Sequence, residues 1–177
     1  MKKYLIVIDM QNDFIDGTLG SPEAAAIVPC VKTRIEEALA EGRSIIFTQD
    51  THHDDYLETS EGRHLPVPHC VQGTPGFDIH PELAPYATQV IRKPTFGFTE
   101  LADILTDSET EPDGKNLDIA LCGLCTDICV VSNALILRAQ FPEATIRLYP
   151  ESCAGTTPEK HNAAIDVMHS CQIDMPK

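Results

Sequence analysis

The sequence lacks several features that would place a chain in a familiar class at once. It has no tryptophan, and aromatic residues make up 6% of its 177 residues. No apolar run approaches the roughly 20 residues that a membrane-spanning helix needs, so we expect no membrane partner. The first apolar run, which follows Met1-Lys2-Lys3, already breaks at Asp9. We therefore expect no secretory signal peptide and a cytoplasmic protein.

Positive charge is also scarce. Thirteen Lys and Arg residues stand against 27 Asp and Glu residues, which gives a formal net charge of −14. Such a field repels phosphate backbones and anionic lipid surfaces, so we expect neither nucleic acid nor membrane as a partner. The 42% hydrophobic and 23% charged residues are ordinary for a globular protein. The length fits one domain, and we expect residues 1–177 to form it.

The cysteine count argues against a disulfide framework. The number of cysteines is seven, which is odd. Together with the absence of a signal peptide, this predicts free or functional thiols in a reducing compartment. The seven are Cys30, Cys70, Cys122, Cys125, Cys129, Cys153 and Cys171.

Short apolar runs alternate with amphipathic segments along the chain. The runs predict strands at Lys3–Ile8, Ser44–Thr48, Gln89–Ile91, Leu117–Leu121 and Thr145–Leu148. Helical patterns cover Ser21 to Gly42, Thr99–Leu105, Asp127–Ala139, and Thr156 to about Ser170. This alternation predicts an α/β fold in which right-handed crossovers build a parallel sheet covered on both faces.

Two segments have no clear periodicity. Thr106–Asn116 is polar and acidic, and we expect a surface loop there. Thr51–Pro85 is rich in Pro, Gly and His, and a stretch of this length without regular structure is usually functional or a lid.

Chemically complementary side chains follow successive predicted strands. Asp9 follows the first, Asp50 and Lys93 lie just beyond the second and third, and Cys129 comes after the fourth. Ligands of open parallel sheets bind outside the carboxyl ends of the strands. The alternative is that each is an ordinary solvated loop residue, but four complementary groups together favour a site.

Cys129 lies in the first turn of a predicted apolar helix. The free backbone N–H groups there favour a thiolate, and a nearby Lys93 ammonium would lower the pKa of the thiol further. Asp9 could take or return its proton. The competing interpretation is a buried structural cysteine.

Asp50 and His52 form an Asp-x-His pair, and His69 follows downstream. Carboxylate oxygen and imidazole nitrogen are ligands for zinc or a similar divalent ion. Glu61 or Glu58 could supply another oxygen. Solvated loop histidines are the alternative.

Cys122 and Cys125 form a CxxC motif between a strand and a helix, which is the layout of thioredoxin-like redox sites. A thiol–disulfide oxidoreductase is therefore a second hypothesis. It leaves Asp9 and Lys93 unexplained.

The sequence resembles the isochorismatase-like cysteine hydrolases, and within them the nicotinamidases. The matching stretches occur in the family's order and cover nearly the whole chain: VIDMQNDF, TQDTH, PHCVQGTPG, RKPTFGFT and GLCTDICV. The resemblance implies a three-layer α/β/α fold with a mostly parallel sheet. It also implies hydrolysis of a small carboxamide, with nicotinamide giving nicotinate and ammonia through a thioester on Cys129.

The resemblance also assigns residues. It implies the catalytic triad Asp9, Lys93 and Cys129, and the metal ligands Asp50, His52, Glu61 and His69, with Glu58 as the alternative to Glu61. It implies substrate contacts at Phe14, Leu124 and Cys125, and a cis peptide bond just before Cys125. The metal would be zinc, with iron and manganese as alternatives. Relatives often form homo-oligomers.

Two positions depart from the family pattern. Nicotinamidases commonly carry an aromatic residue shortly before the third metal ligand, where this chain has Leu65-Pro66-Val67-Pro68. Cys125 stands where many relatives have a small residue such as alanine. Another amide or an N-carbamoyl compound is therefore an alternative substrate, and a non-catalytic binding module is a further hypothesis.

Overall fold

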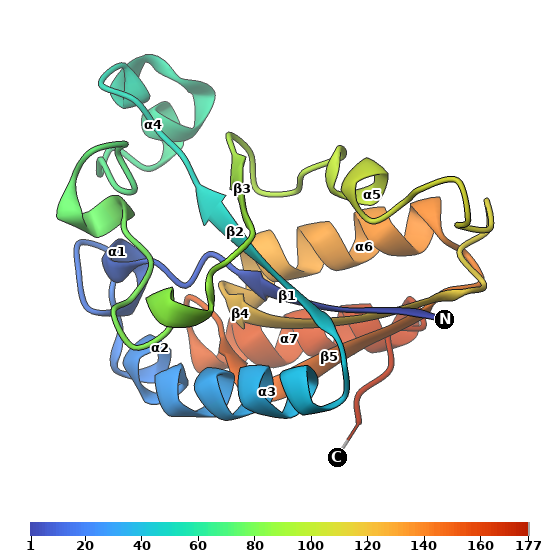
Figure 1. The fold of residues 1–177 in the computed structure, drawn as a ribbon. Helices are drawn as coiled ribbons and strands as arrows, with labels where there is room; N and C mark the ends of the chain where they lie inside the picture. The colour runs from blue at the N-terminus through green and yellow to red at the C-terminus, as the bar shows by residue number, and fades with distance from the viewer. Residues whose placement is uncertain (177) are drawn as a thin grey trace.

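The computed structural model describes residues 1–176 and places five strands in one sheet (Figure 1). The strands run in the order β3-β2-β1-β4-β5, and every neighbouring pair is parallel. Their bounds are β1 Lys2–Ile8, β2 Ser44–Asp50, β3 Val90–Lys93, β4 Leu117–Leu124 and β5 Thr145–Ala154. The predicted parallel sheet is therefore confirmed.

Helices cover both faces of this sheet. α3 packs on one face and α6 lies on the other, with α5 against α6 (Figure 1). α7 contacts both α6 and β5. The helices are α1 Asn12–Ile15, α2 Pro22–Ala26, α3 Val28–Ala40, α4 Ser60–His64, α5 Leu101–Ile104, α6 Val131–Gln140 and α7 Pro158–Ser170. The three-layer arrangement that the family resemblance implied is thus present.

Local chemistry explains where the helices begin and break. The Ser21 side chain accepts a hydrogen bond from the backbone N–H of Ala24 at 3.0 Å, which caps α2. The single helix predicted up to Gly42 is divided near Ile27, since Pro29 lacks the N–H that would continue the ladder. Thr157 caps α7 in the same way, as predicted.

Several predicted boundaries are wrong by a few residues. β2, β3 and β4 extend to Asp50, Lys93 and Leu124, because their final polar or small residues still pair with neighbouring strands. Asp50 and Lys93 are direct partners in the β2–β3 register. The helix predicted from Asp127 begins instead with a π-helical turn, Thr126–Val130, which leads into α6.

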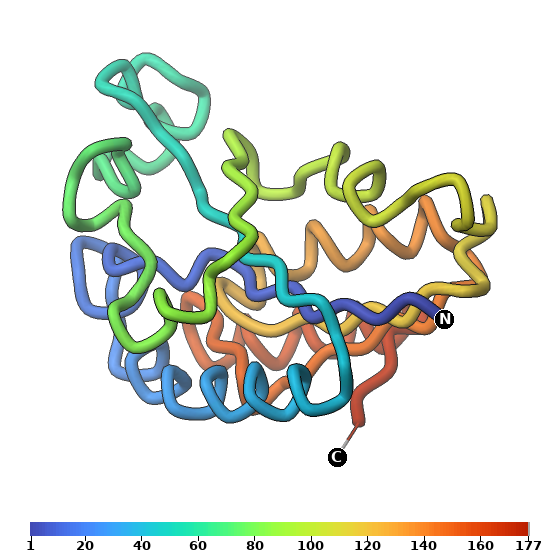
Figure 2. Tube along the Cα trace, in the orientation of Figure 1, coloured from blue at the N-terminus to red at the C-terminus, as the bar shows by residue number. Residues whose placement is uncertain are grey.

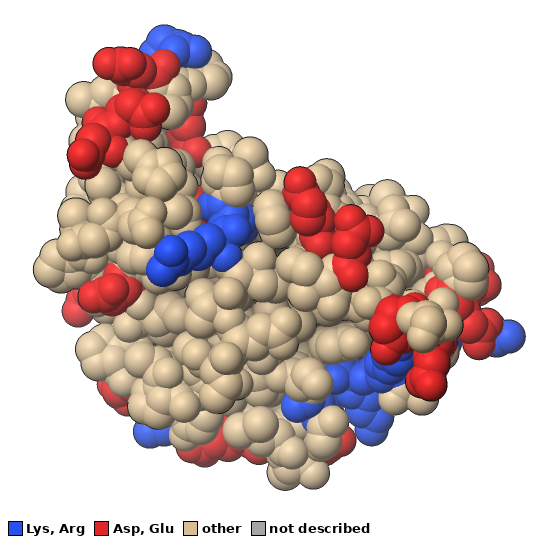
Figure 3. Space-filling model, turned by 45° about the horizontal axis from the view of Figure 1, so that its top comes forward, with Lys and Arg blue, Asp and Glu red and all other residues tan. Residues whose placement is uncertain are grey.

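The segment after β2 projects from the body of the molecule (Figure 2). It holds α4 and three single-turn 3-10 helices: Tyr56–Glu58, Pro75–Phe77 and Ala84–Tyr86. Acidic side chains gather on the projecting part (Figure 3), among them the exposed Asp54, Asp55 and Glu58. Within residues 1–176, no helix has the length and apolar character to cross a membrane.

A buried ion pair lies near the amino-terminal ends of the central strands. Arg43 donates from its two terminal guanidinium nitrogens to the two carboxylate oxygens of Asp118, each at 3.0 Å. Arg147 adds a third contact to Asp118 at 3.1 Å. This bidentate geometry ties the start of β2 to β4.

Candidate active site

The Lys93 ammonium lies at the centre of a buried polar cluster at the carboxyl edge of the sheet. Its nitrogen is 2.6 Å from Oδ2 of Asp9 and 3.4 Å from Sγ of Cys129. It is also 3.4 Å from Oδ1 of Asp50. Asp9 follows β1, Lys93 ends β3, and Cys129 sits in the π-helical turn after β4. Folding therefore brings together the three side chains that the sequence placed at separate strand ends.

Thr48 orients the Asp9 carboxylate. Its hydroxyl donates to Oδ1 of Asp9 at 2.7 Å and accepts from the Asp9 backbone N–H at 3.2 Å. The other carboxylate oxygen is then directed toward Lys93. Sequence reasoning missed Thr48, although its spacing from Asp50 on β2 puts both side chains on one face of the strand.

Burial and the neighbouring charges together determine the ionisation of the three groups. It raises the pKa of the Asp9 carboxyl, although Lys93 opposes this. Burial disfavours the Lys93 ammonium, but Asp9, Cys129 and Asp50 outweigh it and raise the Lys93 pKa. Burial and the Asp9 charge raise the pKa of Cys129 well above its ordinary value, against the effect of Lys93. The prediction of a lowered Cys129 pKa is therefore wrong, because desolvation exceeds the effects of the helix and of Lys93.

Backbone and side-chain hydrogen bonds fix the turn that carries Cys129. The carbonyl of Cys125 accepts from the backbone N–H groups of Ile128 and Val130 at 3.0 and 3.1 Å. Thr126 is buried, and its hydroxyl lies 2.8 Å from Nδ1 of His161 on α7. The peptide bond before Cys125 is cis, as the family resemblance implied.

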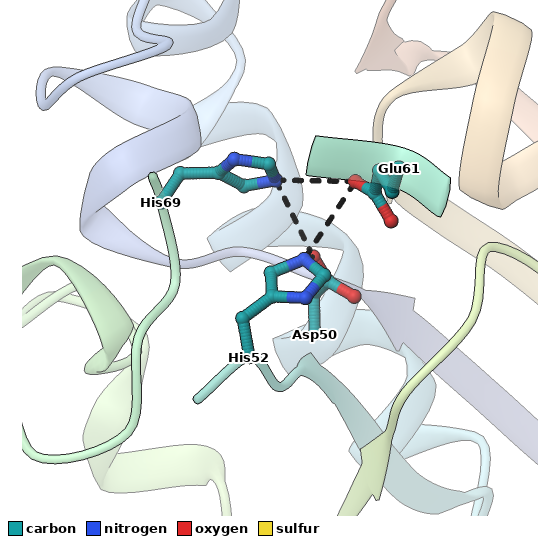
Figure 4. Close-up of side chains that lie close together, drawn as sticks. All are labelled: Asp50, His52, Glu61 and His69. Atoms are coloured by element: carbon teal, nitrogen blue, oxygen red, sulfur yellow. Dashed lines mark ion pairs between the residues drawn. The ribbon is translucent and has the colours of Figure 1, made fainter. Parts of the chain in front are cut away.

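Four side chains converge beside this cluster (Figure 4). They are Asp50, His52, Glu61 and His69, and one ligand atom from each lies within 4.8 Å of all the others. Asp50 comes from the end of β2 and Glu61 from α4, so the projecting segment folds back over the sheet edge. Among the described residues this grouping includes Glu61 and does not include Glu58.

The donor set suits a divalent cation. Nε2 of His52 is buried 3.0 Å from Oδ2 of Asp50, but the contact lacks hydrogen-bond geometry. Nδ1 of His69 is 2.9 Å from the carbonyl of Val67, which leaves Nε2 of His69 to face Glu61 and Asp50. A second ring nitrogen fixed by a carbonyl is typical of metal-binding histidines. Two imidazoles and two carboxylates fit zinc and similar ions.

Two further residues from the first motif hold these ligands in place. The side-chain amide of Gln11 accepts from the Asp50 N–H at 2.7 Å and donates to the Asp50 carbonyl at 2.9 Å. Oδ2 of Asp13 accepts from the N–H of Cys70 at 2.7 Å, next to His69. Both residues belong to the stretch VIDMQNDF, and sequence reasoning missed the role of each.

A cavity of about 830 Å³ opens onto both clusters. Phe14, Leu124 and Cys125, the expected substrate contacts, all line it together with Cys129. The ring of Phe14 lies 5.4 Å from the ring of His69, measured between centroids. Cys129 is 4% exposed and still forms part of the wall of this cavity.

The CxxC pair does not form a redox site of the thioredoxin kind. Cys122 lies inside β4, is fully buried and does not line the cavity. Burial raises the pKa of Cys122 to about 12. A thiol that is buried and has a raised pKa is a poor nucleophile for disulfide exchange. All seven cysteines are free, as predicted.

Known proteins are similar to this chain over nearly its whole length. A nicotinamidase/pyrazinamidase of Mycobacterium tuberculosis is 28% identical over 182 residues, which cover 97% of this chain and 96% of that protein. The crystal structure of nicotinamidase/pyrazinamidase PncA from Bacillus subtilis superposes with a TM-score of 0.83 at 25% identity, covering 100% of both chains.

A pyrazinamidase of Pyrococcus horikoshii, solved in complex with zinc, gives a TM-score of 0.76 at 27% identity, covering 100% of this chain and 99% of that one. The family model described as the Isochorismatase domain matches residues 3–175. The chain therefore belongs to the isochorismatase family.

Proposed function

We propose that this chain is an amidohydrolase that converts nicotinamide to nicotinate and ammonia, with Cys129 as the nucleophile. One observation carries the proposal: the Lys93 ammonium contacts both the Asp9 carboxylate and the Cys129 sulfur, at the wall of one cavity. The family match and the nicotinamidase relatives support the reaction class, hydrolysis of an amide carbon–nitrogen bond. Such an enzyme would serve NAD salvage in the cytoplasm.

The first half of the reaction forms a thioester. Because the resting thiol is protonated, Asp9 accepts its proton as Sγ of Cys129 attacks the amide carbon. Lys93 stabilises the charge that develops on the sulfur. The backbone N–H groups of Cys125 and Cys129 hold the oxyanion, as each such donor typically contributes about 10²–10³ in rate. Asp9 then gives the proton to the departing nitrogen, and ammonia leaves.

The second half removes the acyl group. A water molecule loses a proton to Asp9 and attacks the thioester carbon, and the carbon–sulfur bond breaks. The proton returns to Cys129, so the enzyme is restored and the acid is released. One carboxylate thus serves as base and acid in turn, which its raised pKa favours at neutral pH.

Asp50, His52, Glu61 and His69 would hold a divalent metal, with zinc as the proposed ion. When bound, this ion supplies a positive charge that orients the ring of the substrate. The proposal can be tested without activity: zinc added to metal-free protein should raise the melting temperature, because it binds the folded state. Glu61→Gln should reduce that shift, whereas Glu58→Gln should leave it unchanged.

The alternative within the same site is an N-carbamoyl compound or another carboxamide. The stretch Leu65–Pro68 favours this alternative, because it lacks the aromatic residue that nicotinamidases commonly place there. The triad chemistry would be the same, and only the cavity wall would differ.

A panel of substrates tests both the proposed nicotinamidase activity and this alternative. Nicotinamide, pyrazinamide and an N-carbamoyl amine would be assayed for ammonia and carbon dioxide, with and without a chelator. We expect ammonia alone, from nicotinamide and pyrazinamide. Release of both products from the N-carbamoyl compound only would favour the alternative. Acid-quenched mass spectrometry of protein mixed with nicotinamide should show a nicotinoyl group on Cys129.

A further inference from the structure

We propose that the cavity contains a second, apolar subsite beyond the triad, formed by Leu65, Phe96 and Ile128. The substrate that this subsite selects is a primary carboxamide whose acyl group carries a second, uncharged apolar ring. The inference rests on the proposed function, because it concerns the acyl part of the same substrate.

The size of the cavity is the first reason. Its volume of about 830 Å³ lies in the upper part of the roughly 300–1,000 Å³ range of sites that enclose drug-sized ligands. A carboxamide with one six-membered ring would occupy only a small part of this space. The remainder would hold water or an extension of the substrate.

The distribution of polar groups is the second reason. The inner end of the cavity is lined by polar side chains that are almost fully buried: Asp50, His52, His69 and Cys129. Leu65 and Phe96 line the same cavity but are 38% and 43% exposed, so they form its mouth. Exposed Ser60, His64 and Thr156 also line the cavity, so the apolar part of the mouth is formed by Leu65 and Phe96. Covering this apolar surface removes it from water, which favours an apolar group that leads away from the reacting carbonyl.

The third reason is that the backbone that carries Phe96 is held in place relative to the nucleophile. Asn133 is fully buried, and its side-chain nitrogen donates to the carbonyls of Phe96 at 3.0 Å and Cys129 at 2.8 Å. Its side-chain oxygen accepts from the N–H of Phe98 at 3.0 Å. Lys93 donates to the carbonyl of Thr95 at 3.1 Å. A wall fixed in this way is preorganised for binding.

The charge and attachment of the extension follow from the lining. The described residues around the cavity include no Lys or Arg, while Asp50 and Glu61 are present, so the side chains of the lining favour an uncharged extension over an anionic one. In the proposed reaction the leaving group is ammonia. The second ring must therefore be attached to the acyl side.

Steady-state kinetics can test the subsite. The probes are nicotinamide and a phenyl-substituted pyridine-3-carboxamide, compared by kcat/KM. We expect the wild-type protein to prefer the two-ring amide by at least about tenfold, mainly through KM, since a well-filled apolar pocket gives discrimination of this size. Phe96→Ala and Leu65→Ala should each reduce this ratio severalfold. Leu57→Ala is the matched control for Leu65→Ala. Leu57 is 53% exposed, lies on the same projecting segment as Leu65 and is outside the cavity lining.

The possible failures are distinguishable. If nicotinamide is hydrolysed but the two-ring amide has no advantage, the subsite is refuted and the proposed function stands. The subsite is also refuted if Phe96→Ala and Leu57→Ala change the ratio equally. If an N-phenyl carboxamide outperforms the two-ring amide, the acyl-side assignment is wrong. If neither amide releases ammonia, the proposed function fails and the subsite with it. Melting temperatures of the variants confirm that each one is folded.

Discussion

The two ends of the central sheet each bury a carboxylate against a cation, with different results. At the amino end, Asp118 is held by both terminal nitrogens of Arg43. At the carboxyl end, Asp9 meets the single ammonium of Lys93, which also contacts Asp50 and Cys129. Neither Asp118 nor Arg43 lines the cavity that Cys129 lines.

The difference lies in what each pair can do with a proton. A guanidinium keeps its proton under all ordinary conditions, and its fork matches a carboxylate bidentately. The Asp118 pair can therefore only stabilise the fold. Asp9 has a raised pKa and a thiol neighbour, so its carboxylate can accept a proton and release it again. Similar pairing thus serves structure at one end and, as we propose, chemistry at the other.

The largest expected effect is at the sulfur. Cys129→Ala should lower kcat/KM for nicotinamide by at least about 10⁴-fold, because it removes the thiol that contacts Lys93 and that we propose forms the thioester. Its melting temperature should stay near that of the wild type. Ammonia release and thermal unfolding are the two measurements, and a variant that retains turnover would exclude Cys129 as the nucleophile.

Replacing the proton carrier should have the next largest effect. Asp9→Asn should reduce turnover by about 10²- to 10³-fold, because the amide cannot accept the thiol proton. The fold should persist, since Asp50 still contacts Lys93. Single-turnover kinetics would show slow acylation, and a wild-type acylation rate in this variant would contradict the proposed role.

At the amino end the effect should fall on stability. Asp118→Asn breaks a buried pair and should cost about 3 kcal/mol of unfolding free energy, measured by urea denaturation. The kcat/KM of the folded fraction should be unchanged. The control is Glu151→Gln, which removes the charge of a carboxylate that pairs with Arg34 and is 51% exposed, and it should cost less than about 1 kcal/mol. A large loss of activity in Asp118→Asn would mean that the two ends are coupled.

The smallest effect should come from Thr48. Thr48→Val removes the hydroxyl that donates to the Asp9 carboxylate and should lower kcat by roughly fivefold, in line with about 1 kcal/mol for that hydrogen bond. KM should change little, and Thr48→Ser should restore most of the rate. If Thr48→Ser is as slow as Thr48→Val, packing rather than the hydroxyl is responsible.

The positions of the triad could be predicted from the sequence because parallel strands bring their carboxyl ends to one edge. To place each triad residue at this edge, it was enough to identify the strand at which it lies or which precedes it. The ionisation of Cys129 could not be predicted, because local sequence shows the helix terminus but not the packing that desolvates the thiol. That the three residues catalyse the reaction stays a prediction.

Supporting contacts were harder to predict. Gln11 and Asn133 act through hydrogen bonds to segments far away in the chain, and nothing in their immediate neighbours indicates those partners. The choice of Glu61 over Glu58 came from the family resemblance alone, since their segment has no periodicity. The ends of β2 and β3 were missed because Asp50 and Lys93 are polar, yet their backbones still pair.

The strand order also determines when the site can exist during synthesis. β1 and β3 emerge early, but the sulfur arrives only after β4 has inserted beside β1 and the following turn has formed. A nascent chain or proteolytic fragment that ends before Cys129 lacks one reacting group, however well its first half is folded. Under the proposed function, ammonia release would therefore report that β4 and the following turn have formed, and could serve as a sensor for co-translational folding of this chain.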